Sequence, residues 1–478
     1  MLTQTNSIAP HKHHLRFVIR HLSFVISGLL LTTAASAATP QWICSTAAVP
    51  WRQMPAPQLT EDPAAKPDLL IHTQQPLQQI EGFGGCFNEL GWQVLLTLSE
   101  RDRTQILRDL FADEGCAFTR ARMPIGASDY ARDWYSLDDT PPGSPNDLSL
   151  SHFNIERDRG YMLHYVKAAM TIRPDLQIWL SAWSPPAWMK DNNNYASGHL
   201  KSDPVIQKAY AQYLAKAVQA YQSEGLHIYA CMVQNEPKSD SKYPTCVWTG
   251  EQERDFVRDY MGPAFHEQKV NAEIWLGTIN DAKPEDFAIP VLSDPAAAKF
   301  ITGVAYQWEG KEAIAKTHEF FPTMKLMQSE SECGTGKNSF ADAEHTFALM
   351  RTYFNGGASS YFYWNMVLPP GGVSTWGWKQ NALITIDPTP PAHTITRHPE
   401  FYLMKLASHF IPPGSHLVTT TGNWGDKLAF QTPAGDTVLL VGNSSKSDLP
   451  LIIATGTNES LHLTLPSHSL NAFVLPEK

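Results

Sequence analysis

Residues 228–237 read Ile228-Tyr229-Ala230-Cys231-Met232-Val233-Gln234-Asn235-Glu236-Pro237. The apolar run ends in three polar side chains and a proline, a pattern typical of a buried parallel strand. Proline cannot donate to a strand ladder, so the strand is predicted to stop near Pro237. Asn235 and Glu236 then lie at the carboxyl end of the strand, where (β/α)₈ barrels place their catalytic residues.

The pair formed by Asn235 and Glu236 suits sugar chemistry. An amide can hold a hydroxyl group while the neighbouring carboxyl group moves a proton. The alternative is an ordinary loop carboxylate after a strand, and this stretch alone leaves both interpretations open.

Strand-like and helix-like segments alternate on both sides of this stretch. Counted from Gln79, eight strand-like segments are separated by helix-like ones as far as Met366. Such alternation indicates parallel strands with helices outside, and eight units close into a barrel. An open doubly wound sheet is the alternative, which the lack of a G-x-G-x-x-G turn disfavours. The sequence therefore predicts an α/β fold, with a (β/α)₈ TIM barrel over residues 78–398.

The pattern changes after about Glu400. Short β-like pieces, such as residues 437–441 and 461–465, are separated by turns rich in Gly, Asn and Pro. This is typical of an antiparallel sandwich. We expect residues 399–478 to form an attached antiparallel β-sandwich domain, and the extended segments of residues 38–77 to join its sheet.

Composition limits the class of protein. The 478 residues are 43% hydrophobic and 18% charged, as in soluble globular proteins, and leave room for two domains. The formal net charge of −10 argues against nucleic acid as a partner and favours a neutral ligand. The six cysteines are too few for a disulfide scaffold, and their pairing stays open. Neither C-x-x-C nor H-E-x-x-H occurs, so no metal site is predicted.

The first 37 residues have the order of an export signal. A basic region precedes the apolar residues 24–31, and Ala35-Ser36-Ala37 is a small-residue cleavage signal. Residues 24–31 are too few to cross a bilayer, and no later run is long enough. We therefore expect export to the periplasm or the exterior after cleavage near Ala37, without a stable membrane span. An N-terminal helix is the alternative.

The predicted barrel would bring several carboxylates to one pocket: Glu89, Asp129, Glu236, Asp281, Glu309, Glu330 and Glu332. Retaining glycoside hydrolysis needs two of them, one as proton donor and one as ionised nucleophile. Glu236 and Glu330 end the fourth and seventh strands, which we expect to face each other across the pocket. Glu332 is the alternative to Glu330, but it already lies in the turn after the strand, so we favour Glu330.

Several longer motifs follow one another along the chain. They are Gly82-Phe83-Gly84-Gly85, Arg122-Met123-Pro124, Ser181 through Lys190, Gln234-Asn235-Glu236-Pro237, Leu326 through Glu330, Tyr363-Trp364-Asn365 and Phe410 through Ser415. In this order they resemble glycoside hydrolase family 30, the family of lysosomal glucosylceramidase. The resemblance extends over nearly all of residues 78–478.

The resemblance implies a barrel with an attached β-sandwich, retaining hydrolysis and no cofactor. It implies that Glu236 is the acid/base and Glu330 the nucleophile. Five positions match residues that line the family's sugar site, and a sixth matches a tryptophan of the loop after the eighth strand: Arg122, Asp129, Trp183, Asn235, Trp364 and Trp376. The alternative for Arg122 is a structural ion pair, and for Trp183 and Trp364 a place in the core.

One position departs from the family. Glucosylceramidase has a His-Trp-Tyr run after the sixth strand, and this chain has Gln307-Trp308-Glu309, which argues less for ceramide as the leaving group. The expected function is that of an exported retaining β-glycosidase hydrolysing β-glucosidic bonds in a β-glucoside, glycolipid or β-glucan. An endo-β-1,6-glucanase or another family 30 glycanase is the alternative. A non-catalytic carbohydrate-binding protein is a remote one, since both glutamates are present. The oligomeric state does not follow from the sequence.

Overall fold

The computed structural model describes residues 39–62, 66–141, 143–390, 393–455 and 459–477. The predicted export signal of residues 1–37 lies outside the described residues and stays a prediction. Among the helices that the structure describes, none is long and apolar enough to cross a membrane.

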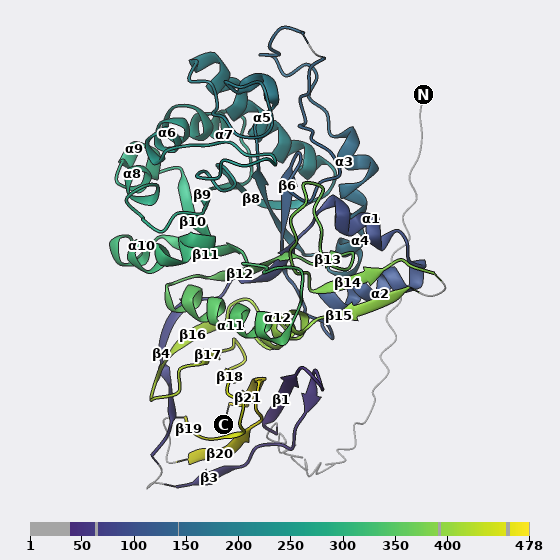
Figure 1. Ribbon diagram of the computed structural model, residues 1–478. Helices are drawn as coiled ribbons and strands as arrows, with labels where there is room; N and C mark the ends of the chain where they lie inside the picture. Colours follow the sequence, from purple (N-terminus) through teal and green to yellow (C-terminus); the bar gives the residue numbers. More distant parts are fainter. Residues whose placement is uncertain (1–38, 63–65, 142, 391–392, 456–458, 478) are drawn as a thin grey trace, which may run out of the picture. The chain divides into compact units, whose positions relative to one another are not determined.

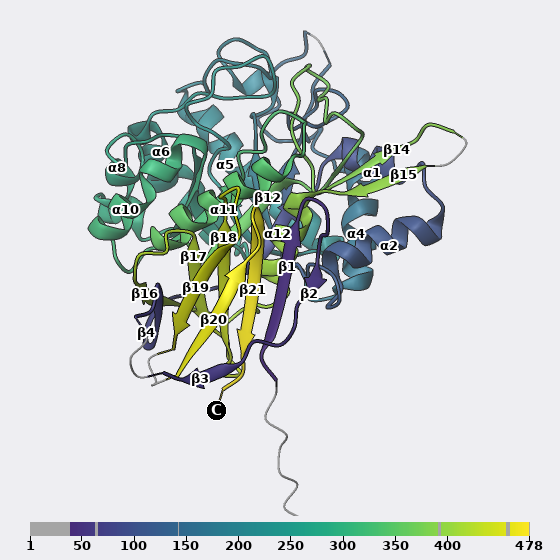
Figure 2. The ribbon, with the colours of Figure 1, turned by 60° about the horizontal axis from the view of Figure 1, so that its bottom comes forward.

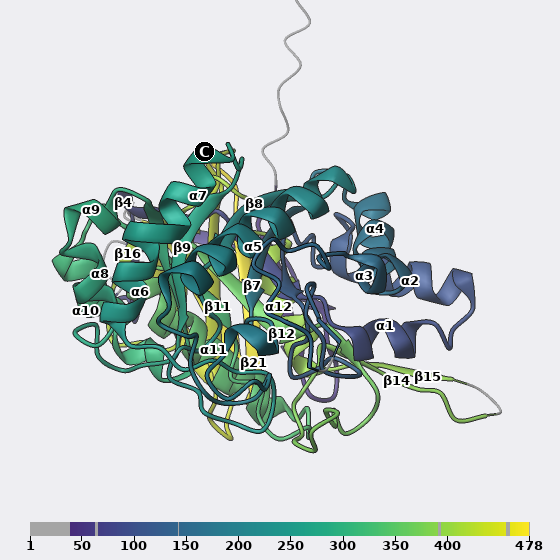
Figure 3. The ribbon, with the colours of Figure 1, turned by 90° about the horizontal axis from the view of Figure 1, so that it is seen from above.

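Eight parallel strands form the first sheet (Figures 1 and 3). Their order, β11-β10-β9-β8-β7-β6-β5-β12, follows the sequence from β5 to β11 and puts β12 beside β5. The Ser359 N–H donates to the Leu326 carbonyl at 2.8 Å and the Phe362 N–H to Gln328 Oε1 at 2.6 Å, so the sheet closes on itself. The strands are β5 (Gly82–Cys86), β6 (Arg120–Ile125), β7 (Gln177–Ala182), β8 (His227–Met232), β9 (Glu273–Ile279), β10 (Ile301–Gln307), β11 (Lys325–Glu330) and β12 (Ser360–Asn365).

Helices follow the strands and lie outside them. Local caps start several of them: Asn88 accepts the Gly91 N–H at 2.7 Å, and Asp203 accepts the Val205 N–H at 2.9 Å. The helices are α1 (Glu89–Leu95), α2 (Glu100–Phe111), α3 (Glu156–Gly160), α4 (Met162–Ile172), η1 (Ala187–Met189), α5 (Pro204–Ser223), α6 (Gly250–Phe256), η2 (Val257–Met261), α7 (Gly262–Glu267), α8 (Ala288–Leu292), α9 (Pro295–Ala298), η3 (Trp308–Glu312), α10 (Ile314–Phe320) and α11 (Phe340–Asn355). The predicted (β/α)₈ barrel is confirmed.

The interior of the barrel is filled by side chains rather than open. One buried cluster joins residues from the six consecutive strands β7 to β12: Trp179, Ala230, Met232, Trp275, Ala305, Met327 and Phe362. Gly303 makes room for the Trp275 ring, because a Cβ atom there would come within 2.5 Å of it. A barrel filled in this way holds its strand ends rigidly, which is what a precise site requires.

The second sheet belongs to the β-sandwich (Figure 2). β1 (Gln41–Thr46) pairs antiparallel with β21 (Ser469–Leu475), and β4 (Leu69–Gln79) lies between β16 and β19. The N-terminal segments therefore share a sheet with the C-terminal ones. The other strands are β2 (Arg52–Gln53), β3 (Leu59–Glu61), β16 (His416–Thr421), β17 (Lys427–Gln431), β18 (Thr437–Asn443), β19 (Leu449–Ala454) and β20 (Glu459–Leu465). The predicted sandwich is confirmed as a fold.

Two features differ from the predicted organisation. The segment assigned to the start of the sandwich forms helix α12 (Pro399–Ser408), which contacts α11, β1, β5 and β21. Its apolar residues recur at helical spacing and Pro399 opens it, signals that the prediction of a β-rich domain overlooked. The loop after β12 also contains a small sheet, made of β13 (Val367–Leu368), β14 (Ile384–Asp387) and β15 (Thr394–Arg397).

Candidate active site

A cavity of about 400 Å³ opens at the carboxyl ends of the barrel strands. Its wall contains five of the predicted residues: Asp129, Trp183, Asn235, Glu236 and Glu330. A larger cavity, of about 1010 Å³, lies at the opposite ends of β7 to β10, beside His227 and Glu273. Neither predicted catalytic glutamate lines the larger cavity, so the smaller one is the candidate active site.

Glu236 lies four residues beyond β8 and is held in place by its backbone. Its N–H donates to the Thr278 carbonyl at 3.0 Å, and its φ of +46° is in the left-handed region that side chains other than glycine avoid. Strained backbone of this kind is concentrated at functional sites. The Glu236 carboxylate is 8% exposed and accepts hydrogen bonds at Oε2 from Ser239 Oγ at 3.0 Å and from the Tyr243 hydroxyl at 2.7 Å.

Glu330 is the last residue of β11 and is 5% exposed. Its Oε2 accepts from Arg122 Nη1 at 2.7 Å, and its Oε1 accepts from the indole Nε1 of Trp308 at 3.1 Å. Burial raises the pKa of Glu330 above its ordinary value, whereas the Arg122 charge and the Trp308 hydrogen bond act against that rise. The nearby Glu236 charge raises the Glu330 pKa further.

Gln307, the last residue of β10, bridges the two glutamates. Its Nε2 donates to Glu236 Oε1 at 3.1 Å and to Glu330 Oε2 at 3.2 Å. These oxygens therefore cannot be farther apart than the sum of the two distances. Both carboxyl groups therefore face one amide nitrogen, an arrangement compatible with the roughly 5–5.5 Å between the carboxyl groups of retaining glycosidases.

Arg122 lies behind the two glutamates and does not line the cavity. It is fully buried, and its guanidinium group stacks 4.4 Å from the Trp183 ring centroid and 5.1 Å from that of Trp364. Besides Glu330, it donates to Asn235 Oδ1 at 2.5 Å. The structure therefore gives Arg122 the role of an ion-pair partner that orients Glu330 and Asn235, rather than that of a wall residue.

The orientation of the Asn235 amide follows from its neighbours. Its Oδ1 accepts from Arg122 and from Thr278 Oγ1, the latter at 2.9 Å. Because the arginine side chain can only donate, the oxygen of Asn235 must face it. The amide NH₂ group of Asn235 is then left to donate to a ligand hydroxyl in the cavity.

Asp129 offers the cavity another hydrogen-bonding group. It follows β6, is 6% exposed, and its Oδ1 has no hydrogen-bond partner among the described residues. Burial, Glu330 and Glu236 raise the pKa of Asp129 well above its ordinary value. A buried group of this kind needs a partner, which a sugar hydroxyl can supply.

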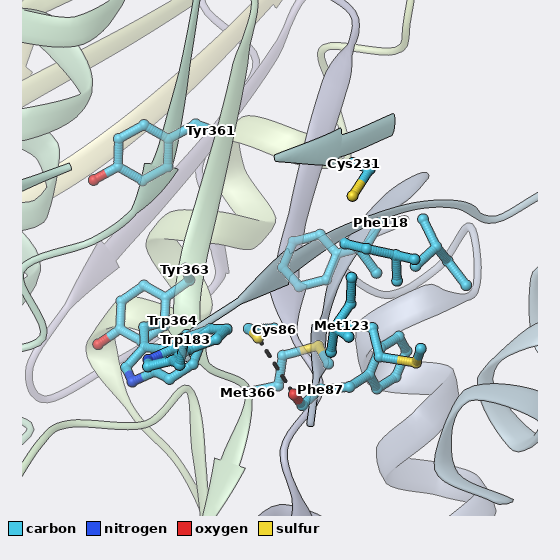
Figure 4. Close-up of a cluster of buried hydrophobic side chains, with 14 of the residues drawn as sticks. Cys86, Phe87, Phe118, Met123, Trp183, Cys231, Tyr361, Tyr363, Trp364 and Met366 are labelled. Atoms are coloured by element: carbon cyan, nitrogen blue, oxygen red, sulfur yellow. Dashed lines mark hydrogen bonds between the residues drawn. The ribbon is translucent and has the colours of Figure 1, made fainter. Parts of the chain in front are cut away.

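The predicted tryptophans have different places. Trp183 lines the cavity, and Trp364 stacks against it with ring centroids 5.4 Å apart (Figure 4). Trp364 itself is 1% exposed and supports the wall from behind. Trp376 stacks on Trp134 instead, at 6.4 Å, and Trp378 of the same loop lines the cavity. Sequence reasoning chose Trp376, although two tryptophans two residues apart gave no means of deciding between them.

The remaining strand-end carboxylates divide into two groups. Glu309 lines the cavity. The others are outside its wall and pair with basic side chains: Glu89 with Arg157, Asp281 with Lys238, and Glu332 with Lys311 and His345. Glu332, the alternative nucleophile, is therefore held away from the cavity. Sequence reasoning missed Ser239 and Tyr243, for which nothing in the pattern after Pro237 offered a signal.

The described residues contain no group of three or more His, Cys, Asp or Glu side chains that could hold a metal ion. All six cysteines are free and buried. The site contains two facing carboxyl groups with an arginine behind them. Amide, carboxyl and aromatic groups surround its small cavity.

The hydrogen bond from Trp308 to Glu330 predicts a pH effect. The nucleophile Glu330 attacks only as an ionised carboxylate, so activity is lost as the pH falls through the pKa of Glu330. Trp308→Phe removes a donor to the charged form, so we expect the acid limb of kcat/KM to move to higher pH by about one pH unit, since such a bond is worth about 1.5 kcal/mol. The pH profile measures this directly. The control is Trp376→Phe, at a ring that contacts Trp134, which should leave the acid limb of kcat/KM in place. An unchanged acid limb in Trp308→Phe would refute the role of the Trp308 indole in stabilising the charged form of Glu330.

A barrel whose strand ends bring two buried carboxyl groups together, with unpaired polar groups beside them, fits the site of a glycoside hydrolase. The comparison with protein families agrees. The model described as the glycosyl hydrolase family 30 TIM-barrel domain matches residues 80–411, and the family 30 β-sandwich domain matches residues 414–473. The chain belongs to glycoside hydrolase family 30, as the sequence motifs indicated.

Similar proteins include enzymes named for two different substrates. The chain is 28% identical to the lysosomal acid glucosylceramidase of Mus musculus over 433 residues, which are 85% of this chain and 83% of that protein. It is also 28% identical to an endo-1,6-β-D-glucanase of Aspergillus fumigatus over 432 residues, 84% of this chain and 85% of that one. The family is thus shared with glucosylceramidases and with endo-β-1,6-glucanases.

Solved structures share the fold. SrfJ from Salmonella typhimurium has a TM-score of 0.85 and 24% identity, over 92% of this chain and 100% of that one. The structure of an endo-β1,6-glucanase has a TM-score of 0.80 and 22% identity, over 92% of this chain and 99% of that one. The fold of this chain is therefore found in solved structures over nearly all of its length.

Proposed function

We propose that this glycoside hydrolase is a retaining β-glycosidase that cleaves β-glucosidic bonds with Glu236 as acid/base and Glu330 as nucleophile. The observation that carries the proposal is the Gln307 amide, which donates to both carboxylates and so brings the two carboxyl groups together, as the retaining mechanism requires. The choice of β-glucosides as substrates is supported by two relatives named for glucosyl substrates, a glucosylceramidase and an endo-1,6-β-D-glucanase.

In the first step, a carboxylate oxygen of Glu330 attacks the anomeric carbon while Glu236 gives its proton to the glycosidic oxygen. The bond from the anomeric carbon to the leaving-group oxygen breaks, and a glycosyl ester to Glu330 forms. The Arg122 charge and the Trp308 N–H keep Glu330 oriented for this attack. In the second step, Glu236 takes a proton from water, the hydroxyl oxygen attacks the anomeric carbon, and Glu330 leaves as a carboxylate.

Both displacements occur at the anomeric carbon, so the configuration is inverted twice and retained overall. We therefore expect the first-formed product from an aryl β-glucoside to be the β-anomer. Proton NMR during the first minutes of the reaction detects it before mutarotation. An initial α-anomer would contradict the assigned mechanism, and no release of aryl alcohol would contradict the β-glucosidase activity.

Endo-β-1,6-glucanase activity is the second candidate function. It is supported by the relative of Aspergillus fumigatus that is named for it, at the same identity as the glucosylceramidase. Product sizes from a β-1,6-glucan distinguish the two, since an endo-acting enzyme releases mixed oligosaccharides and an exo-acting one releases glucose alone.

A further inference from the structure

The cavity wall contains polar groups that bond to nothing in the described part of the chain. The Glu309 carboxylate and the Lys379 ammonium are exposed, and neither forms a hydrogen bond or ion pair with a described residue. The indole Nε1 of Trp378 is buried and likewise has no partner there. None of these three groups is used by the two-step reaction described above.

Trp378 and the turn that carries Glu309 are connected to the Glu236 side of the cavity. The Tyr243 hydroxyl donates to Glu236, and the edge of its ring meets Trp378 with centroids 4.5 Å apart, which puts Trp378 beside the acid/base. Lys379 follows Trp378 in the chain and lines the same cavity, where it packs against Gly336. The turn that carries Glu309 packs on the end of β9, because a Cβ at Gly310 would come within 2.4 Å of the Ile279 carbonyl.

The end of β9 is tied in turn to Glu236. Asn280 Nδ2 donates to Ser239 Oγ at 3.0 Å, and Ser239 donates to Glu236. Asp281, and more weakly Glu309, raise the pKa of Lys238, two residues beyond Glu236. The acid/base protonates the leaving-group oxygen, so the wall next to it is where the leaving group must lie.

A hydroxyl group both donates and accepts hydrogen bonds, so the hydroxyls of one sugar unit can serve a carboxylate, an ammonium group and an indole N–H together. An alkyl chain in the same place would displace water from the Glu309 carboxylate and the Lys379 ammonium group without offering either a hydrogen bond. The face of Trp378 further offers an apolar surface to the C–H face of a sugar ring.

We propose that the leaving group of this enzyme is a sugar unit, held by Glu309, Lys379 and Trp378, rather than a lipid. The inference rests on the proposed β-glucosidase activity and adds the class of leaving group. The natural substrate is then a β-linked glucan or oligosaccharide. These three side chains determine that choice without taking part in bond breaking.

The test compares leaving groups on one enzyme. The substrates are 4-nitrophenyl β-glucoside, octyl β-glucoside, and the β-1,3-, β-1,4- and β-1,6-linked glucobioses. We expect at least one glucobiose to have a higher kcat/KM than octyl β-glucoside. Glu309→Gln should lower kcat/KM for that glucobiose about tenfold and leave the octyl and 4-nitrophenyl glucosides within about twofold, because only the sugar leaving group uses the carboxylate.

Matched variants on the same surface act as controls. Glu312→Gln removes an exposed carboxylate from the same turn, outside the cavity wall. Lys337→Met removes an exposed ammonium group, also outside the wall, next to Gly336, which packs against Lys379. Neither control should change the preference for the glucobiose over octyl β-glucoside, whereas Lys379→Met should weaken that preference as Glu309→Gln does. A higher kcat/KM for octyl β-glucoside than for every glucobiose, or no selective loss in Glu309→Gln, would overturn the inference. Failure to cleave 4-nitrophenyl β-glucoside would instead overturn the proposed function.

Discussion

Replacement of Glu330 by glutamine is expected to lower kcat on an aryl β-glucoside by on the order of 10⁴-fold or more. An amide of the same shape cannot form the glycosyl ester, so the covalent route is closed. The change keeps the volume of the side chain, although Arg122 then faces a neutral oxygen at the 2.7 Å contact. The measurement is steady-state hydrolysis, with circular dichroism to show that the variant is folded.

Glu332→Gln is the matched control, because Glu332 belongs to the same Ser-Glu repeat but pairs with Lys311 and His345 outside the cavity wall. We expect it to stay within a few-fold of the parent. A 2-deoxy-2-fluoro glycosyl fluoride should accumulate as an ester, and peptide mass spectrometry should find the label on Glu330. Label on Glu332, together with an active Glu330→Gln variant, would show that the nucleophile is the other glutamate.

Glu236→Ala should affect substrates according to their leaving groups. A substrate whose leaving group needs a proton is expected to lose about 10²–10⁴-fold in kcat/KM, whereas a 2,4-dinitrophenyl β-glucoside should lose little, since its leaving group departs unprotonated. Without the base, hydrolysis of the ester to Glu330 becomes slow. Rates over a series of aryl glucosides of decreasing leaving-group acidity measure the dependence.

Azide separates this role from a structural one. Azide can attack the glycosyl ester to Glu330 without a general base. It should therefore accelerate turnover of the dinitrophenyl substrate by Glu236→Ala and give a β-glucosyl azide. Glu251→Ala, an exposed glutamate on α6, should resemble the parent and form no azide product. An equal loss on all substrates without azide rescue would withdraw the acid/base role from Glu236.

Much of the barrel could be predicted because its signals are local. An apolar run such as that before Asn235 favours a buried strand by its own composition, and its alternation with amphipathic segments leaves few topologies. The α12 segment shows the limit. Its helical spacing was present in the sequence, but its position between the barrel and β1 depends on contacts that span much of the chain.

The site was predictable where a strand end alone defines the position of a side chain. Glu236 follows a buried strand and Glu330 ends one, and parallel strands bring their carboxyl ends to one face. Trp376 and Trp378 share a long loop, whose course depends on the residues it packs against. The choice between them was therefore beyond sequence reasoning, and so was the place of Arg122 behind the wall rather than in it.

By itself, the sequence determined the class of fold, the family and the two glutamates at the strand ends, since periodicity and motif order are properties of the chain. The tertiary structure decided which groups meet. Arg122 reaches Glu330 across 208 positions of sequence, and Gln307 joins two glutamates that belong to different strands. Hydrogen bonds of a few ångströms depend on the closure and stagger of the barrel, and no local pattern encodes those.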